Sequence, residues 1–412
     1  MTLDDLPDHA TFRAAARDWI ARHAPWDHLV QISHARFAGQ PFEHEHDWLA
    51  LARRWQKLKY DAGWACLVWP VEYGGRGLSP TENVIFQEEE GPFAELFNPF
   101  MIGQGFVAPT LMAYASEAQR RRFLPPLASG EAIWCQMFSE PGVGSDLAGV
   151  RARATACEGG WRLQGQKVWT SGAHHSEWGI VLVRTDASAP KHKGMTMFFV
   201  RMDTPGITVR PIKQLSGASH FNQVFFDDVF VSDEQRLGGV NEGWKVALTT
   251  LTNERMTLGA STPVGFDEVF ELARSVAGDG HAPIESEDVR LRLAEWYAKV
   301  TGMRFGVYRM LSAMARGRQP GAEVAVGKLV GAGTTQAIAA YGLELLGARA
   351  RVADPGDDDV RRFHSMFSFG AIHRLEGGTD EVLRNILAER ALGLPAEQRT
   401  DRGPFRDVPT AP

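Results

Sequence analysis

The chain has 412 residues with 44 basic and 50 acidic side chains, and its net charge of −6 without a Lys/Arg-dense face argues against nucleic acid as a partner. Its three cysteines are too few for a disulfide framework and no Cys/His cluster has the spacing of metal ligands, so neither a disulfide scaffold nor a metal centre is predicted. Because the sequence has neither a signal-peptide core nor a run of about 18 apolar residues, we expect a cytoplasmic protein without a membrane span.

The first part of the chain has the pattern of amphipathic helices. Apolar side chains recur at helical spacing between Phe12 and Ile20 and again between Trp48 and Leu58. Proline and glycine interrupt the pattern in WPVEYGGRGLSP and end it in LPPLASGE. We therefore predict an all-α domain over residues 1–132.

From Trp134 the pattern changes to short strands. Runs of β-branched and aromatic residues such as WGIVLVRTD and GMTMFFVRMD alternate with Gly, Asp and Pro, which predicts a central β domain over 133–238. Helical patterns return after GGVNEGW, so a second all-α domain is predicted over 239–395, followed by a loose polar tail over 396–412. Strands do not alternate with helices, so the fold class is α+β and not a doubly wound nucleotide-binding sheet.

One motif of the β region indicates a binding site. In CQMFSEPGVGSDLAGV, Ser139 ends a strand, and Glu140 to Asp146 form a compact turn of exposed amides and small residues whose backbone N–H groups a ligand can approach closely. A second strand ends later in the chain at Trp169, Thr170 and Ser171. An indole and hydroxyls at paired strand ends suit a flat heterocycle, but the same pattern also fits a tryptophan that fills a β core beside a Ser/Thr turn.

This motif resembles the signature of the acyl-CoA dehydrogenase family, whose members use FAD. The resemblance extends through GWACLVWPVEYGGRG, FLPPLASGE, NQVFFDDVFV, NEGW and GGTDEVLRNILAERALGLP, roughly over residues 45 to 395 in the family's order and spacing. Val143 departs from the pattern, because a small residue is usual there. The resemblance implies three domains: an N-terminal helical domain, a central β-barrel or sandwich domain and a C-terminal four-helix-type domain.

The resemblance also implies a chemistry and a set of binding residues. Family members remove the α-proton of an acyl-CoA with a carboxylate while the β-hydride goes to flavin N5, which gives a trans-2-enoyl-CoA. Ser145 is expected near the pantetheine or phosphate arm of CoA and is a candidate for both cofactor and substrate binding. By matching positions, the residues expected to line the flavin are Phe138, Ser139, Trp169, Thr170 and Ser171.

Two glutamates compete for the role of the base. In the family's commonest pattern the base directly precedes the Gly-Thr of the terminal motif, but Gly377 occupies that position and Glu376 comes one residue earlier. The following residues have the pattern of a helix start with Thr379 as N-cap. Such a helix end suits flavin or phosphate contacts, so Gly378, Thr379 and Glu381 are expected to bind the cofactor.

The other candidate is Glu254 in LTTLTNERMTLG. Its helical spacing from Ala247 and Leu251 places its carboxylate on an apolar stripe, where burial is costly unless the group is paired, neutral or functional. An ion pair with a cationic neighbour would explain a carboxylate at this position without any functional role. A branch of the family that includes isovaleryl-type dehydrogenases places its base on this helix just before an Arg, as in NER here. We therefore predict Glu254 as the base, with Glu376 as the alternative and Arg255 as a substrate-binding candidate.

Two elements that usually hold FAD phosphates between subunits are altered. The family's Arg-x-Phe-Gly has no match in HAPIESEDVRLRLAEWYAKV, and Glu344 replaces the glutamine of Gln-x-x-Gly-Gly, where its charge would repel a pyrophosphate. Similar changes occur in bacterial steroid-degradation relatives that pair two different subunits. The resemblance therefore implies a homotetramer or a heterotetramer with a related subunit, and electron-transfer flavoprotein or a similar acceptor as redox partner.

Three hypotheses follow. The leading one is an FAD-dependent acyl-CoA dehydrogenase acting on a bulky or branched acyl-CoA, such as one with a steroid side chain. The second is a partner subunit of a heterotetrameric dehydrogenase that lacks a complete site of its own. The third is a flavin monooxygenase or oxidase on the same fold, against which Glu254 argues because such an enzyme needs no glutamate base.

Overall fold

The computed structural model divides the chain into two compact units. The first consists of Met1–Pro25, His46–Glu254 and Ala396–Pro412, and the second of Trp26–Glu45 and Arg255–Pro395. The structure describes residues 7–32, 45–259, 265–275, 280–314, 316, 318, 321–322, 324–352, 356–396, 401 and 403–408. One boundary between the units falls inside helix α8, Gly243–Gly259, directly after Glu254.

The first unit begins with helices whose ends follow from local sequence. Helix α4 starts at a capping box in which the Ser79 side chain accepts from the backbone of Glu82, and α7 starts in the same way at Ser116 and Gln119. Gly130 ends α7 in the left-handed conformation, which glycine adopts without strain. The α-helices before the sheet are α1 Pro7–His23, α3 Glu45–Asp61, α4 Pro80–Glu89, α5 Asn98–Met101, α6 Ala108–Tyr114 and α7 Glu117–Ser129, with a π-helical turn at Ile102–Val107.

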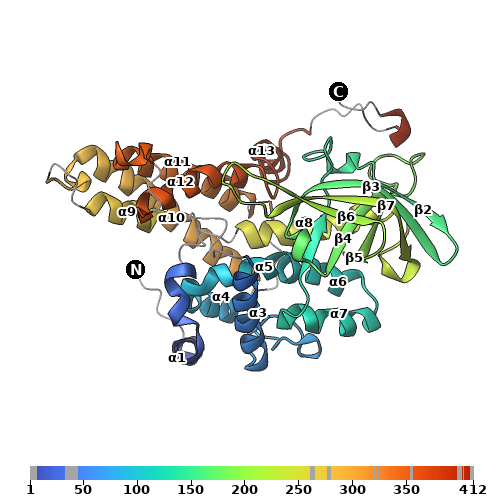
Figure 1. Ribbon diagram of the computed structural model, residues 1–412, viewed down its shortest axis with the longest axis horizontal. Helices are drawn as coiled ribbons and strands as arrows, with labels where there is room; N and C mark the ends of the chain where they lie inside the picture. Colours follow the sequence, from blue (N-terminus) through green and yellow to red (C-terminus); the bar gives the residue numbers. More distant parts are fainter. Residues whose placement is uncertain are drawn as a thin grey trace. The chain divides into compact units, whose positions relative to one another are not determined.

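An eight-stranded sheet follows these helices (Figure 1). Its order is β6-β7-β3-β2-β4-β5-β8, and β1 pairs with β4 in parallel. Some neighbouring strands, such as β3 and β7, are not consecutive in sequence, and a backbone bond from Val168 to Ser139 joins the end of β1 to β3. The strands are β1 Trp134–Met137, β2 Arg153–Cys157, β3 Gly160–Ser171, β4 Trp178–Arg184, β5 Met195–Arg201, β6 Ile207–Ile212, β7 Phe221–Ser232 and β8 Arg236–Leu237.

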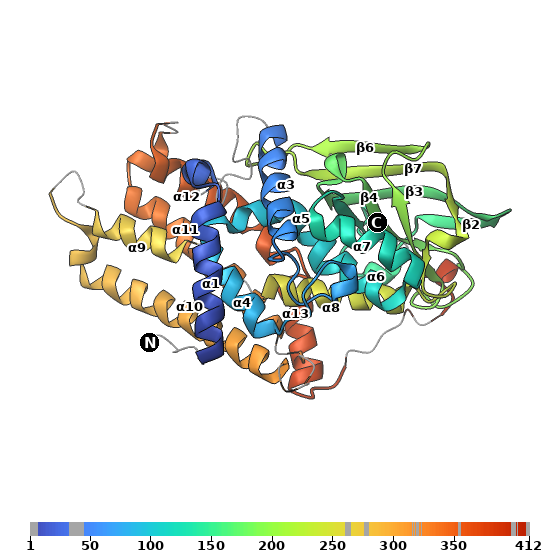
Figure 2. The same cartoon turned by 90° about the horizontal axis from the view of Figure 1, so that it is seen from below.

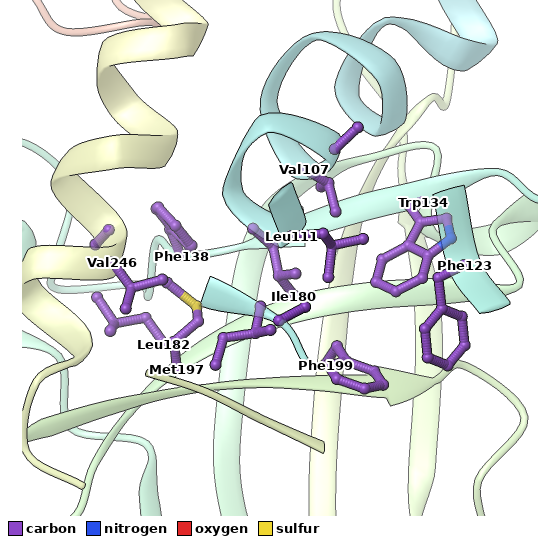
Figure 3. Packing of buried hydrophobic residues seen from close by; sticks show 14 of the residues in the cluster. Val107, Leu111, Phe123, Trp134, Phe138, Ile180, Leu182, Met197, Phe199 and Val246 are labelled. Carbon is purple, nitrogen blue, oxygen red and sulfur yellow. The ribbon is translucent and has the colours of Figure 1, made fainter. Parts of the chain in front are cut away.

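The side chains of β1 alternate between two apolar cores. Cys135 and Met137 are buried in a cluster of sheet residues, whereas Trp134 and the following Phe138 are buried in a larger cluster shared with the helices. This larger cluster includes Val246 at the start of α8 (Figure 3). The larger of the two cores is therefore shared by the sheet, the N-terminal helices and the first half of α8.

A segment near residue 405 returns to the sheet of this unit. The side chain of Phe405 is only 5% exposed, and the Arg184 guanidinium lies 3.8 Å from its ring centre. Backbone bonds from Phe405 N to Ala189 O and from Arg406 N to Ala187 O fix the segment. The expectation of a loose tail is therefore wrong for residues 403–408, because a single aromatic anchor outweighs their polar composition.

The second unit consists of helices that lie side by side (Figure 2). Its core gathers Trp296, Ile338 and Phe363 from three helices. Close packing depends on Gly342, because a Cβ there would come within 2.1 Å of the Phe363 ring. The helices are α9 Phe266–Arg274, α10 Glu287–Met314, α11 Val324–Leu346, α12 Asp358–Gly370 and α13 Asp380–Ile386, which continues into a π-helical turn at Leu387–Ala391.

The observed order of helical, sheet and helical regions confirms the predicted α+β fold class and its three-part architecture. The predicted domain limits at 132/133, 238/239 and 395/396 stay predictions, because the two compact units divide the chain differently.

Candidate active site

The ends of β1 and β3 lie next to each other, as the sequence predicted. The backbone N–H of Val168 donates to the carbonyl of Ser139 over 2.9 Å, which joins the residue after the β1 strand to β3. Directly beyond this bond the pairing of β3 with β7 is irregular, and Trp169 has a φ of +60°. Its indole is 58% exposed, so the alternative of a tryptophan that fills a β core is wrong. The positive φ explains the exposure, because the bulge turns the side chain out of the strand's alternation.

Thr170 is the opposite case, because it is buried and its hydroxyl has no protein partner among the described residues. Its backbone carbonyl accepts from the Asn222 amide over 3.0 Å, so the main chain is fixed while the side chain remains available. A buried hydroxyl without a partner is unusual in folded proteins and suits a ligand that supplies the missing bond. Ser171 follows at the strand end, half-buried and paired with Phe221 of β7.

The turn after Ser139 combines an open surface with a buried anchor. Gly142, Gly144 and Ser145 are exposed, and a Cβ on either glycine would meet no atom within 4 Å. Val143 points inward and is 6% exposed, which explains why a larger residue is tolerated at this position. A flat ligand can therefore approach the backbone of the turn closely. Together with the unpartnered Thr170 hydroxyl, these residues fit a flavin.

A buried ion pair stabilises this turn. Glu140 belongs to the predicted turn of exposed backbone amides, but its side chain is buried. The Lys167 ammonium donates to Glu140 Oε1 over 2.8 Å and to the Phe138 carbonyl over 3.0 Å. The carboxylate also accepts from the backbone N–H groups of Arg151 and Ala152, over 2.7 and 2.9 Å. Burial lowers the pKa of Lys167, and the neighbouring Glu140 opposes this shift. Sequence patterns gave no sign of the pair, since its members are 27 positions apart.

Glu254 lies on the predicted apolar face of α8. Ala247 is fully buried and Leu251 packs against the same cluster, while Glu254 one turn further on is half-buried. Its Oε2 accepts a hydrogen bond from the side-chain amide of Gln136, over 3.1 Å. Gln136 lies on β1, two residues before Phe138, and sequence reasoning did not select it. The carboxylate is thus held next to the strand that leads to the expected flavin-lining residues.

The terminal motif, which contains the three residues assigned to cofactor contacts, lies in the second unit. The Thr379 hydroxyl accepts from the backbone N–H of Val382, which confirms Thr379 as the N-cap of α13. Gly378 precedes it at a φ of +98°. A hydrogen bond from its own backbone N–H, followed by one from Thr379, lowers the pKa of the exposed Glu381. These residues form one compact helix start.

Glu376 has a different environment from Glu254. Its Oε1 lies 2.6 Å from Nδ1 of His373, and both side chains are about one-third exposed. Glu376 precedes two glycines with positive φ, Gly377 and Gly378, so the backbone turns sharply between it and the helix start.

The segment in which Glu344 replaces the family's glutamine lies on the exposed surface of α11. Glu344 is exposed, and its carboxylate lies 3.9 Å from the Arg292 guanidinium of α10. The same guanidinium lies over the Tyr341 ring at 4.5 Å. Glu344 thus presents an exposed carboxylate at the position where the resemblance expects a glutamine.

Family models match almost the whole of the described chain. The N-terminal domain of acyl-CoA dehydrogenase matches residues 7–131, its middle domain 135–229 and its C-terminal domain 241–392. The chain belongs to the acyl-CoA dehydrogenase family. It is therefore an oxidoreductase, and FAD is its cofactor.

Relatives of this acyl-CoA dehydrogenase include two from Mycobacterium tuberculosis. Acyl-CoA dehydrogenase FadE34 is 41% identical over 335 residues, which cover 81% of this chain and 45% of that protein, so the chain spans less than half of that relative. Acyl-CoA dehydrogenase IpdE1 is 35% identical over 401 residues, covering 96% of this chain and all of that protein.

Two solved structures share the fold of this acyl-CoA dehydrogenase over their full length. The Tcur3481-Tcur3483 steroid ACAD is 29% identical with a TM-score of 0.80, and the ChsE4-ChsE5 complex from M. tuberculosis is 28% identical with a TM-score of 0.78. Each match covers 96% of this chain and 100% of the other. In the part of the chain that the structure describes, no helix has the length and apolar character needed to cross a membrane.

Proposed function

We propose that this acyl-CoA dehydrogenase converts a bulky or branched acyl-CoA into its trans-2-enoyl-CoA, with Glu254 as the base. The observation that carries the proposal is the half-buried Glu254 carboxylate on the apolar face of α8, hydrogen bonded to β1 beside the flavin-lining strand ends. A carboxylate among apolar groups is a stronger base for a carbon acid than a fully solvated one. Glu376, whose Oε1 lies 2.6 Å from Nδ1 of His373, is the weaker candidate.

The residues proposed for catalysis and binding have separate roles. FAD, when bound, accepts the hydride from the β-carbon of the substrate. Glu254 takes the α-proton: the C–H bond breaks, an O–H bond forms on the carboxyl group, and the electron pair of the C–H bond enters the new double bond. Ser145 on the exposed turn, together with Arg255, binds the CoA arm. The residues that hold the flavin here are Phe138, Ser139, Trp169, Thr170 and Ser171.

The start of α13 in the second unit is also proposed to bind the cofactor. Gly378, Thr379 and Glu381 lie at the start of α13, and the N-terminal end of a helix favours negatively charged groups such as a phosphate. Electron-transfer flavoprotein, or a similar acceptor, removes the electrons after the reaction.

The substrate class is supported by relatives. A structural neighbour is named a steroid ACAD and aligns over its full length, so acyl-CoA thioesters with a steroid side chain are the first class to test. Straight-chain acyl-CoA thioesters of similar length serve as the comparison.

A second candidate function is that of one subunit in a heterotetramer. The exposed Glu344 in the altered phosphate element favours it, because its charge disfavours a pyrophosphate across a subunit contact. The names of two structural neighbours each give a pair of proteins, which supports a related partner chain. A homotetramer that completes its own sites is the competing assembly.

An absorbance spectrum of the chain purified alone, before and after addition of excess FAD, separates these candidates. We expect a flavin band that is bleached anaerobically by a bulky acyl-CoA and more slowly by a straight-chain one. A protein that stays colourless with FAD but gains the band with a related subunit supports the heterotetramer. Bleaching that requires no acyl-CoA, or oxygen consumption that forms no enoyl-CoA, would contradict the dehydrogenase.

A further inference from the structure

Gln136 occupies a position on β1 whose neighbours on the same face are apolar. Trp134 and Phe138, two residues before and after it, are 1% and 5% exposed in the cluster that also contains Val246 of α8 (Figure 3). Alternation along the strand places Gln136 on this face. A side-chain amide in such a row is costly to desolvate unless its hydrogen bonds are satisfied.

The amide of Gln136 is only half satisfied. Its Nε2 donates to Glu254 Oε2 over 3.1 Å. Its Oε1 is buried and accepts no hydrogen bond from the part of the chain that the structure describes. Most buried side-chain polar atoms have a partner, so an unused acceptor directly beside a proposed base requires a physical reason.

The two ends of the amide match the two protonation states of a carboxyl group. A carboxylate only accepts hydrogen bonds, whereas a carboxylic acid also has one O–H to donate. An amide offers N–H groups at one end and a carbonyl oxygen at the other, and a rotation of about 180° exchanges them without changing its shape. Because Oε1 has no bond to lose within the described residues, this rotation breaks only the bond to Glu254 that it replaces.

We propose that Gln136 is a positioning residue for Glu254, donating to the carboxylate before proton abstraction and accepting from the carboxylic acid after it. The proposal rests on the proposed function of Glu254 as the base. A donor on Oε2 fixes the orientation of the carboxylate before the reaction, and the rotated amide accepts from the O–H group of the carboxylic acid after it. A lysine or arginine at position 136 would hold the carboxylate more strongly but could not accept from the acid.

The test compares Gln136→Met, which keeps the side-chain length and removes both functions of the amide, with the wild-type holoenzyme. Gln104→Met is the matched control, because Gln104 is also a buried amide, but it donates to the backbone carbonyl of Leu127. The rate constant of anaerobic flavin reduction at saturating acyl-CoA should fall roughly tenfold to a hundredfold in Gln136→Met, as expected for loss of a hydrogen bond to a charged group. Binding of the acyl-CoA and the visible spectrum of FAD should stay as in the wild type. Gln136→Glu, which lacks the N–H donor when ionised, carries the test if Gln136→Met does not fold.

An infrared readout detects the contact without turnover. The carboxylate band of Glu254, identified by its loss in Glu254→Gln, should shift in Gln136→Met and stay in place in Gln104→Met. An unshifted band, or flavin reduction at the wild-type rate, would overturn the positioning role. If Glu254→Gln itself reduces flavin normally, the assignment of the base fails and the role of Gln136 fails with it. If Glu254→Gln is inactive while Gln136→Met is unaffected, only the positioning role fails.

Discussion

Replacement of Lys167 by methionine should destabilise the first unit by about 3 kcal/mol. Lys167 is fully buried and its ammonium bonds to Glu140 Oε1 and to the Phe138 carbonyl. Removing one member of a buried ion pair typically costs about 3–5 kcal/mol, because the other charge stays buried without its partner. Glu140 keeps two backbone N–H donors, from Arg151 and Ala152, so we expect the lower end of that range.

The assay is a guanidinium titration of the protein followed by far-ultraviolet circular dichroism. Lys193→Met is the control, because Lys193 is an exposed lysine of the same unit and its replacement should change the free energy of unfolding by less than about 0.5 kcal/mol. The double variant Lys167→Met/Glu140→Gln should be less destabilised than the sum of the single variants, since it leaves no unpaired charge. A free energy of unfolding for Lys167→Met that equals that of Lys193→Met would refute the reasoning.

The same pair predicts a dependence on pH. Burial lowers the pKa of Lys167 in the folded state, so between this pKa and the unfolded value of about 10.4 the unfolded protein binds more protons. Stability from this site therefore rises with pH across that window. Lys167→Met has no group to titrate there and should lose the rise, which unfolding titrations at several alkaline pH values measure.

Three further predictions concern single side chains. Thr170→Val should weaken FAD binding to the apoprotein roughly twofold to tenfold, as expected for a neutral hydrogen bond. The stability of the apoprotein should not fall, because the hydroxyl has no protein partner among the described residues. Unchanged affinity in a fluorescence titration would contradict this prediction. Phe405→Ala should release residues 403–408 from the sheet, seen as faster proteolysis there, and equal cleavage rates would contradict the anchoring role. Thiol titration of the native protein should show fast reaction of the exposed Cys157 only, because burial raises the pKa of Cys66 and Cys135 to about 12; a fast phase that survives in Cys157→Ser would contradict this.

The sequence predicted those parts of the site that depend on local pattern. Helical spacing placed Glu254 on the apolar face of α8, and the Thr-Asp-Glu pattern identified Thr379 as the N-cap of α13. The strand patterns placed the Gly-rich turn after β1 and the Trp-Thr-Ser segment at the end of β3, as observed. Each of these features is encoded within a few residues of chain.

The missed features all depend on contacts between distant residues. Gln136 lies 118 positions from Glu254, and the pattern of β1 marks it only as one polar residue among apolar ones. Glu140 belongs to a turn predicted to expose its amides, and nothing near it in sequence shows that its side chain pairs with the buried Lys167. The anchor at Phe405 is a single aromatic residue in a polar, proline-rich segment, which composition alone predicts to be loose.

The most direct test of Glu254 as the base is a single-turnover measurement with the holoenzyme. Anaerobic flavin reduction by a bulky acyl-CoA would be followed in Glu254→Gln and in the matched variant Glu376→Gln. The proposed mechanism predicts that Glu254→Gln retains bound FAD and binds the acyl-CoA but reduces the flavin at least about a hundredfold more slowly, whereas Glu376→Gln stays close to the wild type. Rapid reduction in Glu254→Gln together with loss of reduction in Glu376→Gln would contradict the assignment and move the base to the terminal motif.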